Sequence, residues 1–444
     1  MSSSTALAGR GSRAARLVSL SLAAALIFAG CSGSSPGGSA ATVPTDASQV
    51  KGDLNIVVSS AAGSDAGFKA INSAFSAKYP NVKVNFTAVP NENYNQTRTS
   101  RLTAGSIDLV VAAPKQLPSY VPASNEGDDA RLADAGGWVD LTNQPFMKKF
   151  TQSVLDQIKY KGKNYTVPTG LSYYTGLTYN KKIFADNNLQ IPTTWDEFIT
   201  LCNTLKAKGI TPISIGGKDT AGIIMLSIVQ SLYPTTADKQ DLAKGLYAYT
   251  VKLNEGQQLQ VLQKTQQVYT FGQPNFAGSN YSQMTSDFLT GKAAMISDGT
   301  WNVGSLRSAN KVDFGYFPLP ASNTAADNAS LGGKVELSLG IPSNAKNIPA
   351  AMAWLQVFAD NYSLFNDQAG FAPAETGVTG DPFYSGIASY TKTFQPAWDT
   401  IWIPNTKAGQ AAALPFNWTA VTPMGSSDAQ AAADAAEKDW EAGK

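Results

Sequence analysis

Residues 54–88 read LNIVVSSAAGSDAGFKAINSAFSAKYPNVKVNFTA, and their apolar spacing changes twice. The run 54–58 is apolar and rich in β-branched residues, which predicts a buried strand. Val82, Val84, Phe86 and Ala88 alternate with polar residues, which predicts a second strand. A helix is predicted between them, because apolar residues recur at spacings of three and four before Pro80: Phe68, Ile71, Phe75 and Tyr79.

Working outward from this stretch, residues 91–104 are polar and predict another helix, and residues 107–113 (IDLVVAA) predict a third strand. The order β-α-β-α-β implies a parallel sheet with right-handed crossovers. The fold class that we expect is therefore α/β.

A second α/β region begins near residue 170, with a predicted strand at 174–179. Thr194 and Glu197 form a capping box for a helix that Gly209 ends. The next predicted strand, 210–215, leads into Gly216-Gly217-Lys218-Asp219, and ligands of open α/β sheets bind outside such carboxyl ends. The later predictions are helices at 221–233, 254–269, 281–290 and 347–361, and strands at 293–297, 312–318 and 335–341.

The amino-acid composition of the 444-residue chain excludes several classes of function. The chain has 34 Lys and Arg against 33 Asp and Glu, so it lacks the excess of positive charge that would attract nucleic acid or an anionic membrane. Histidine is absent, which excludes histidine bases, Ser-His-Asp machinery and imidazole metal sites. Cys31 and Cys202 are the two cysteines, and Cys202 lies on an apolar helical face typical of an inert core thiol. We expect no metal and no cofactor.

The N-terminus has the pattern of a secretory signal: three arginines, the apolar run 17–28, then Ala29 and Gly30. Cys31 follows and resembles the lipidated cysteine of bacterial lipoproteins, although Phe28 stands where Leu is usual. Residues 31–50 are small, polar and rich in Pro and Gly, which predicts a flexible tether. The alternative is a plain signal peptide, 1–30, cleaved near a cysteine that is there by chance.

Three blocks carry a family resemblance. They are YTGLTYNKKIFADNNLQIPTTWDEFITLCNTLKAKGITPISIGGKD (174–219), FLTGKAAMISDGTW (288–301) and LGGKVELSLGIPSNAKNIPAAMAWLQVFAD (331–360). Together they resemble family 1 of the extracellular solute-binding proteins of carbohydrate ABC importers, the maltose-binding type. The resemblance implies a type II periplasmic-binding-protein-like fold, with the ligand in a cleft between two α/β lobes.

Carried over, the resemblance places lobe one at 51–168 plus 317–361, and lobe two at 171–314 plus 362–444, with hinges near 168–170 and 317–320. It implies a monomeric, lipid-anchored receptor on the extracellular face of the cytoplasmic membrane. Such a receptor binds a disaccharide or oligosaccharide and delivers it to the permease subunits of an ABC transporter.

The site residues follow from the resemblance and from sugar chemistry, which needs aromatic rings for the sugar's faces and polar side chains for its hydroxyls. Trp301 is similar in position to the family's stacking tryptophan. Tyr173 and Tyr174 follow the first hinge; strand alternation buries one of them, and we favour Tyr173 as the contact. The other candidates are Asp219, Lys218, Lys115, Glu92, Asn93, Glu336 and Phe371, with Phe383 and Trp418 as further lid residues.

Two other functions stay open. A secreted glycan-cleaving enzyme would need two carboxylates flanking the scissile bond, and the sequence pairs none of its acids. A binder of the same fold could instead take a polyamine or a peptide, which would require an acidic cleft. The resemblance favours a binding protein that is not an enzyme.

Overall fold

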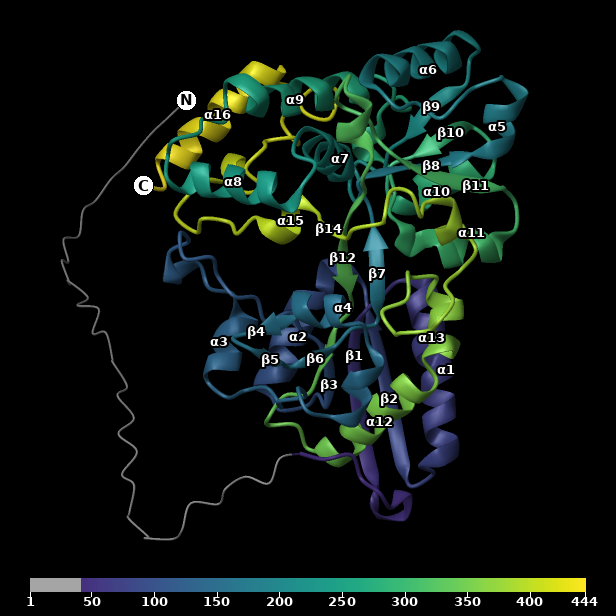
Figure 1. Ribbon diagram of the computed structural model, residues 1–444, viewed down its shortest axis with the longest axis vertical. Helices are drawn as coiled ribbons and strands as arrows, with labels where there is room; N and C mark the ends of the chain where they lie inside the picture. Colours follow the sequence, from purple (N-terminus) through teal and green to yellow (C-terminus); the bar gives the residue numbers. More distant parts are fainter. Residues whose placement is uncertain (1–40) are drawn as a thin grey trace, which may run out of the picture. The chain divides into compact units, whose positions relative to one another are not determined.

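The computed structural model describes residues 41–444 (Figure 1). The predicted signal sequence, Cys31 and the first ten residues of the predicted tether lie outside the described residues. Within the described part, no helix combines the length and the apolar composition needed to cross a membrane.

The second half of the predicted tether packs against the folded part of the chain. Val50 is 2% exposed in a core cluster, and Ala41 and Val43 pack against the same cluster. The side-chain amide of Gln144 donates to the carbonyl of Ala41 at 2.8 Å. The prediction of a tether over 31–50 was therefore wrong for residues 41–50, whose few apolar side chains find a core to cover.

Lobe one is built on a five-stranded sheet. In order across the sheet its strands are β2 (Val82–Val89), β1 (Gly52–Ser59), β3 (Leu109–Val111), β13 (Leu339–Gly340) and β6 (Thr166–Val167). β1 pairs in parallel with β2 and with β3, which confirms the β-α-β-α-β prediction. β13 and β6, from later in the chain, extend this sheet by antiparallel pairing.

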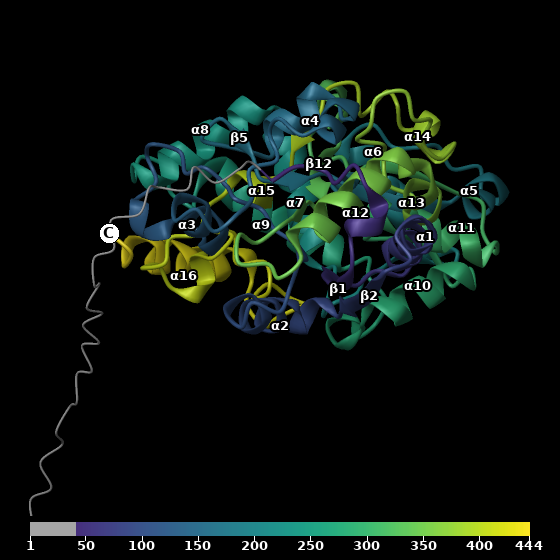
Figure 2. The same ribbon diagram turned by 90° about the horizontal axis from the view of Figure 1, so that it is seen from below.

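The helices of lobe one cover that sheet. They are α1 (Ala62–Lys78), α2 (Asn91–Thr103), α3 (Asp128–Asp134), α4 (Gln152–Gln157), α12 (Ile348–Asp360) and α13 (Tyr362–Ala369). α1, α12 and α13 lie next to one another (Figure 2). The predicted helical face of α1, Phe68, Ile71 and Phe75, is fully buried between them and the sheet. A hairpin of β4 (Lys159–Tyr160) and β5 (Lys163–Asn164) follows α4.

Lobe two is built on a four-stranded sheet in the order β11 (Phe314–Pro318), β8 (Gly176–Asn180), β10 (Ala293–Ile296) and β9 (Thr211–Ser214). The predicted capping box at Thr194 and Glu197 is present. Gly209, with φ +72°, follows that helix in a conformation that favours glycine. The helices are α5 (Lys181–Asp186), α6 (Trp195–Ala207), α7 (Gly222–Leu232), α8 (Thr236–Tyr247), α9 (Gly256–Tyr269), α10 (Tyr281–Leu289), α15 (Trp398–Ile401) and α16 (Ala429–Glu441).

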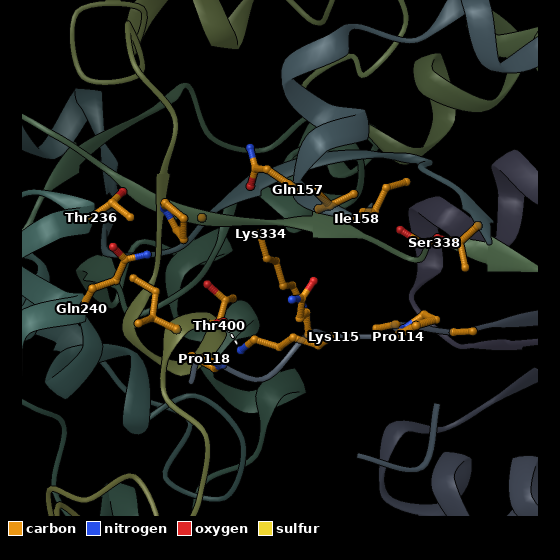
Figure 3. A pocket seen from close by; sticks show the side chains of 18 of the residues that line it. Pro114, Lys115, Pro118, Gln157, Ile158, Thr236, Gln240, Lys334, Ser338 and Thr400 are labelled. Atoms are coloured by element: carbon orange, nitrogen blue, oxygen red, sulfur yellow. Dashed lines mark hydrogen bonds between the residues drawn. The ribbon is translucent and has the colours of Figure 1, made fainter. Parts of the chain in front are cut away.

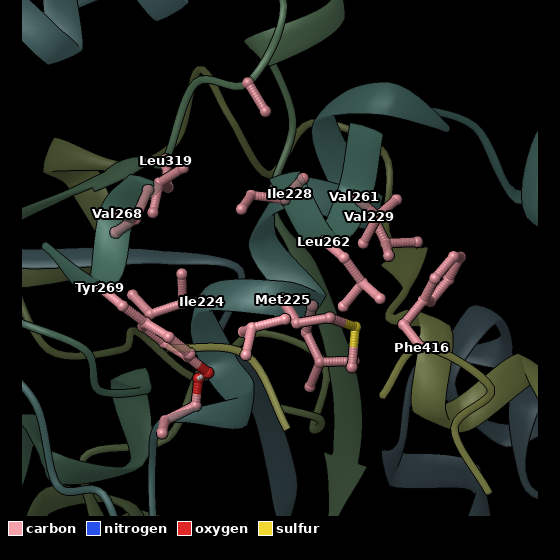
Figure 4. Packing of buried hydrophobic residues seen from close by; sticks show 14 of the residues in the cluster. Ile224, Met225, Ile228, Val229, Val261, Leu262, Val268, Tyr269, Leu319 and Phe416 are labelled. Carbon is pink, nitrogen blue, oxygen red and sulfur yellow. Dashed lines mark hydrogen bonds between the residues drawn. The ribbon is translucent and has the colours of Figure 1, made fainter. Parts of the chain in front are cut away.

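Helix α7 runs through the centre of lobe two. Ile224, Met225, Ile228 and Val229 are fully buried there and pack with residues of α9 and with Phe416 (Figure 4). The C-terminal region closes the same core, since Trp398, Trp402 and Trp440 belong to this cluster. The end of the chain is therefore part of the body of lobe two.

Three segments cross between the lobes. The first is β7 (Gly170–Tyr173), which lies between β6 of lobe one and β8 of lobe two. The second is β12 (Gly332–Glu336), antiparallel to β7, and the third includes β14 (Gln395–Pro396), parallel to β12. Figure 1 shows β7 and β12 running side by side between the two halves of the described part.

The packing differs from the expected lobe limits in two places. β11 pairs with β8 and Leu319 is buried in the core of lobe two, so the return crossing is β12 and not 317–320. The segment from α13 to α14 (Phe383–Gly386), which we expected in lobe two, packs into the core of lobe one. Tertiary contacts of apolar side chains decide both placements.

One expected strand is divided. Residues 335–341 were predicted as a single strand, but β12 ends at Glu336 and β13 begins at Leu339. Leu337 between them has φ +37°, in the left-handed region that breaks a strand. The break lets the chain leave the crossing pair and enter the sheet of lobe one. α11 (Val303–Ala309), which follows the segment around Trp301, packs against α13.

Candidate functional site

A pocket of about 810 Å³ lies between the two lobes. Lobe one supplies the chain that follows β3, together with Gln157, Ile158 and Ser338. Lobe two supplies residues of α8 and of the segment around α15. Strand β12 forms the wall where the lobes meet, with Gly333, Lys334 and Val335. Figure 3 shows these side chains converging from several elements.

The lobe-one wall begins where β3 ends, at the carboxyl edge of the parallel strands, as the fold class predicts. Lys115 extends from this wall toward lobe two, and its ammonium donates a hydrogen bond to the carbonyl of Thr400 (Figure 3). Protein atoms displace water around this ammonium, which lowers the pKa of Lys115 to about 8, while Asp399 opposes the shift.

The lobe-two wall includes α8, which contributes Thr236, Gln240, Asp241 and Lys244 to the pocket. The sequence analysis did not predict this helix. The sequence does contain a capping pattern for this helix, because Thr235 caps it. The Thr235 hydroxyl accepts a hydrogen bond from the amide of Asp238 at 3.1 Å, and the Asp238 carboxylate accepts one from the amide of Thr235 at 3.0 Å. This T-x-x-D form differs from the T-x-x-E pattern that marked α6.

Lys334, on the β12 wall of the pocket, carries an ammonium that lies over two aromatic rings. The Nζ atom of Lys334 lies 5.4 Å from the ring centroid of Trp301 and 5.8 Å from that of Tyr174. The same atom is 3.4 Å from Oε1 of Glu336, which is 6% exposed and also accepts a hydrogen bond from the hydroxyl of Ser172. Ser172 and Lys334 thus hold the Glu336 carboxyl group in place.

Trp301 and Tyr174 form a pair, with ring centroids 5.4 Å apart and planes at 44°. Both residues come from lobe two: Tyr174 follows β7, and Trp301 lies in the short 3-10 turn Thr300–Asn302 after β10. Trp301 is half-buried and contacts both large core clusters. Tyr174 is buried at 3% exposure, so Trp301 is the member of the pair with a partly exposed ring beside the charged groups.

A hydrogen-bonded chain orients the indole of Trp301. Its Nε1 donates to the hydroxyl of Tyr281 at 3.3 Å, and that hydroxyl donates to the carboxylate of Asp298 at 3.0 Å. Asp298 is fully buried and also accepts from the amide of Gly299 and from the Asn302 side chain. Burial raises the pKa of Asp298 to about 7, against the opposing effect of these donors.

Asp399 is a polar group that the sequence analysis missed. Its carboxylate accepts the Tyr174 hydroxyl at 2.8 Å and is exposed to water. Protein atoms around it displace part of the surrounding water and raise the pKa of Asp399, while Lys334 and Lys115 oppose the shift. No motif marks this residue, because α15 is one short turn whose contacts come from distant segments.

Residues 59–361, more than half of the chain, match the sequence profile described as bacterial extracellular solute-binding protein. The chain belongs to that family. The multiple sugar-binding protein of Streptococcus mutans is similar to this solute-binding protein, with 24% identity over 326 residues, 71% of this chain and 74% of that protein.

Two solved structures share the fold of this solute-binding protein. RafE in complex with raffinose, also solved in its apo form from Streptococcus pneumoniae, has a TM-score of 0.72 at 21% identity and covers 88% of this chain and 100% of RafE. A sugar transporter of Bacillus licheniformis in complex with stachyose has a TM-score of 0.68 at 15% identity, with 88% and 100% covered. These neighbours confirm the two-lobed α/β fold that we predicted.

One predicted site residue of this solute-binding protein, Lys115, lines the pocket. Three others, Trp301, Tyr174 and Glu336, do not line it but contact Lys334, which does. Tyr173, which we favoured over Tyr174, points instead into the core of lobe one and is 5% exposed. Strand alternation sends the two tyrosines to opposite sides, but both are buried, since Tyr174 is 3% exposed in the core of lobe two.

Asp219 and Lys218 of the solute-binding protein lie on the loop after β9 and do not line the pocket. The Asp219 carboxylate accepts from the amide of Tyr281 at 2.7 Å, so it holds the residue that orients Trp301. Lys218 is exposed. Asp219 therefore supports the aromatic group from outside the pocket.

The remaining candidates lie elsewhere. Glu92 and Asn93 are in the first turn of α2, and Asn93 is exposed away from the pocket lining. Phe371 is 2% exposed in the core of lobe one, against Gly170, so the prediction of a cleft contact there was wrong. Phe383 is buried in the same core, and Trp418 packs on Gly222 of lobe two. Hydrophobic burial is the reason that these rings leave the cleft.

Proposed function

We propose that this solute-binding protein is the receptor of a bacterial ABC importer and that its ligand is a disaccharide or an oligosaccharide. The observation that carries the proposal is the group next to the pocket-lining residue Lys334, whose ammonium lies over the Trp301 and Tyr174 rings, with the Asp399 carboxylate bonded to Tyr174. A sugar presents C–H surface to rings and hydroxyls to charged groups, and each hydroxyl buried without a partner would cost free energy.

The names of the related proteins support the same ligand class. The relative from S. mutans is a multiple sugar-binding protein, and the two structural neighbours hold raffinose and stachyose. A polyamine is less compatible with the pocket. Among the described residues that line it, Lys115, Lys244 and Lys334 are cationic and Asp241 is acidic. A cationic ligand would meet repulsion at three places.

The proposal includes binding without turnover and delivery of the sugar to permease subunits by a monomer. The lobes would close about the three crossing segments, since hinges of this type absorb rotation in a few residues. The carboxylates nearest the rings already have partners: Glu336 has Ser172 and Lys334, and Asp399 has Tyr174. This supports a binding role for them.

A thermal-shift screen of mono-, di- and oligosaccharides tests the proposed ligand class. A true ligand at about 100 times its Kd should stabilise the protein by about 2.7 kcal/mol. Each hit is then incubated as a labelled oligosaccharide: recovery of intact sugar supports a receptor, and cleavage products would show an enzyme. Stabilisation by peptides or polyamines with no response to any sugar would contradict the proposed ligand.

We also propose that Cys31 carries a lipid anchor on the extracellular face of the cytoplasmic membrane. The support is the arginine-rich start, the short apolar run and the Ala29-Gly30-Cys31 junction. Cys31→Ser is expected to release the protein from the membrane fraction or to stall its processing, measured by fractionation and intact mass. Cys202→Ser is the matched control and should remain in the membrane fraction. Normal trimming and membrane retention of Cys31→Ser would contradict the anchor.

A further inference from the structure

Residues 114–126, here called the strap, connect β3 to α3 and pass from lobe one toward lobe two. Both ends are fixed in lobe one: β3 lies in its sheet, and at the far end the Glu126 carboxylate accepts the hydroxyl of Tyr160 at 3.1 Å. Residues 114–120 of the strap supply part of the pocket wall. In Figure 1 this segment rises from the region of α3 toward α8.

The strap contacts lobe two at three places along its length. Near its start, the Lys115 ammonium donates to the Thr400 carbonyl. In the middle, the ring of Tyr120 lies 5.8 Å from that of Tyr247 and packs against the core of lobe two. At its end is Asn125, a polar side chain that is 8% exposed.

Both polar atoms of the Asn125 side-chain amide form hydrogen bonds with lobe two. Its Nδ2 donates to the hydroxyl of Tyr247 at 3.1 Å. Its Oδ1 accepts from the hydroxyl of Thr406 at 2.9 Å and from the amide of Thr406 at 3.3 Å. A buried amide whose partners all belong to the other lobe would lose them together when the lobes separate.

Tyr247, which receives the Asn125 amide, is itself held by lobe two. The Tyr247 hydroxyl donates to the carbonyl of Ile403 at 2.7 Å, and its ring packs 5.4 Å from Trp402 and 5.3 Å from Trp440. Neither partner of Asn125 lines the pocket. The contacts of Asn125 therefore lie outside the pocket, and a ligand in the pocket is not required to form them.

We infer that the strap is a latch between the lobes: its own contacts with lobe two favour the closed arrangement, in addition to any contact made by a solute in the pocket of about 810 Å³. Closure about a hinge in two-lobed proteins usually follows from contacts that the ligand makes with both lobes. Here Lys115, Tyr120 and Asn125 join the lobes directly, and such contacts lower the free energy of the closed form relative to the open form. The inference concerns the site of the proposed function and holds whichever solute binds there.

Small-angle scattering of the ligand-free protein tests the latch. Asn125→Ala removes the amide contacts, and a second variant adds Lys115→Met to remove the other hydrogen bond. Each lost set of contacts should lower the ratio of closed to open protein by about 5- to 30-fold. The radius of gyration should therefore rise from wild type to Asn125→Ala and again in the double variant.

Asn143→Ala is the matched control, because Asn143 is exposed on a turn of lobe one, and its radius should equal that of the wild type. Thr406→Val, which removes only one hydroxyl, serves if Asn125→Ala melts below the measuring temperature, and it should give a smaller rise. Equal radii for wild type and all latch variants would overturn the inference. Since no sugar is present, failure of the sugar screen leaves this result unaffected.

Discussion

Replacing Trp301 with Ala is expected to weaken binding of the sugar found in the screen by roughly 5- to 30-fold. A Trp side chain has about 150–250 Å² that a ligand can cover in part. Covering a third of it is worth about 1–2 kcal/mol at about 25 cal/mol per Å², which corresponds to that change in Kd. Titration calorimetry on the wild type and the variant measures it.

The matched control is Trp195→Ala. Trp195 is also a tryptophan of lobe two, but it lies at the start of α6 under the ammonium of Lys264, 3.9 Å from the ring centroid, and packs against Phe198 in the core. This variant should lose stability and keep its affinity. Trp301 is half-buried, so its own variant should lose less stability than the about 3–5 kcal/mol expected for a buried Trp. Unchanged affinity of folded Trp301→Ala would remove this residue from the site.

Trp440→Ala is expected to lower the free energy of unfolding by about 3–5 kcal/mol. Trp440 on α16 is fully buried, its ring lies 5.2 Å from Trp402, and its Nε1 donates to the carbonyl of Leu246 at 3.0 Å. Truncation leaves a large cavity and an unpaired carbonyl in the core of lobe two. Thermal and denaturant unfolding, followed by circular dichroism, measure the loss.

The control for this stability effect is Trp418→Ala, since Trp418 is half-buried against Gly222 in the same lobe. It should cost clearly less than Trp440→Ala, because less of its surface is removed from water. Equal and small losses in the two variants would show that the C-terminal helix is not part of the core of lobe two.

Local patterns predicted much of this fold. The alternation in β2, the three- and four-residue spacing in α1 and the capping box of α6 each depend on neighbours in the chain, and the structure shows all three elements. Helix α8 was missed because its cap uses Asp238 where the recognised pattern has Glu. The prediction of a flexible tether was wrong for residues 41–50, because it rested on composition alone. A few apolar side chains in this segment are enough to pack it against the core of lobe one.

The sequence by itself determined the α/β class, the parallel start of lobe one, the absence of histidine chemistry and the motifs that resemble the family. Only the tertiary structure decided which lobe holds α13 and α14, that β12 is the return crossing, and that Tyr174 rather than Tyr173 lies beside Trp301. It also brought Asp399 to Tyr174 and Asn125 to Thr406, pairs separated by 225 and 281 positions. The physical reason is the sequence distance over which each interaction acts. Periodicity and capping act between neighbouring residues, whereas core burial and cleft contacts join side chains that come close only after the chain has crossed between the lobes.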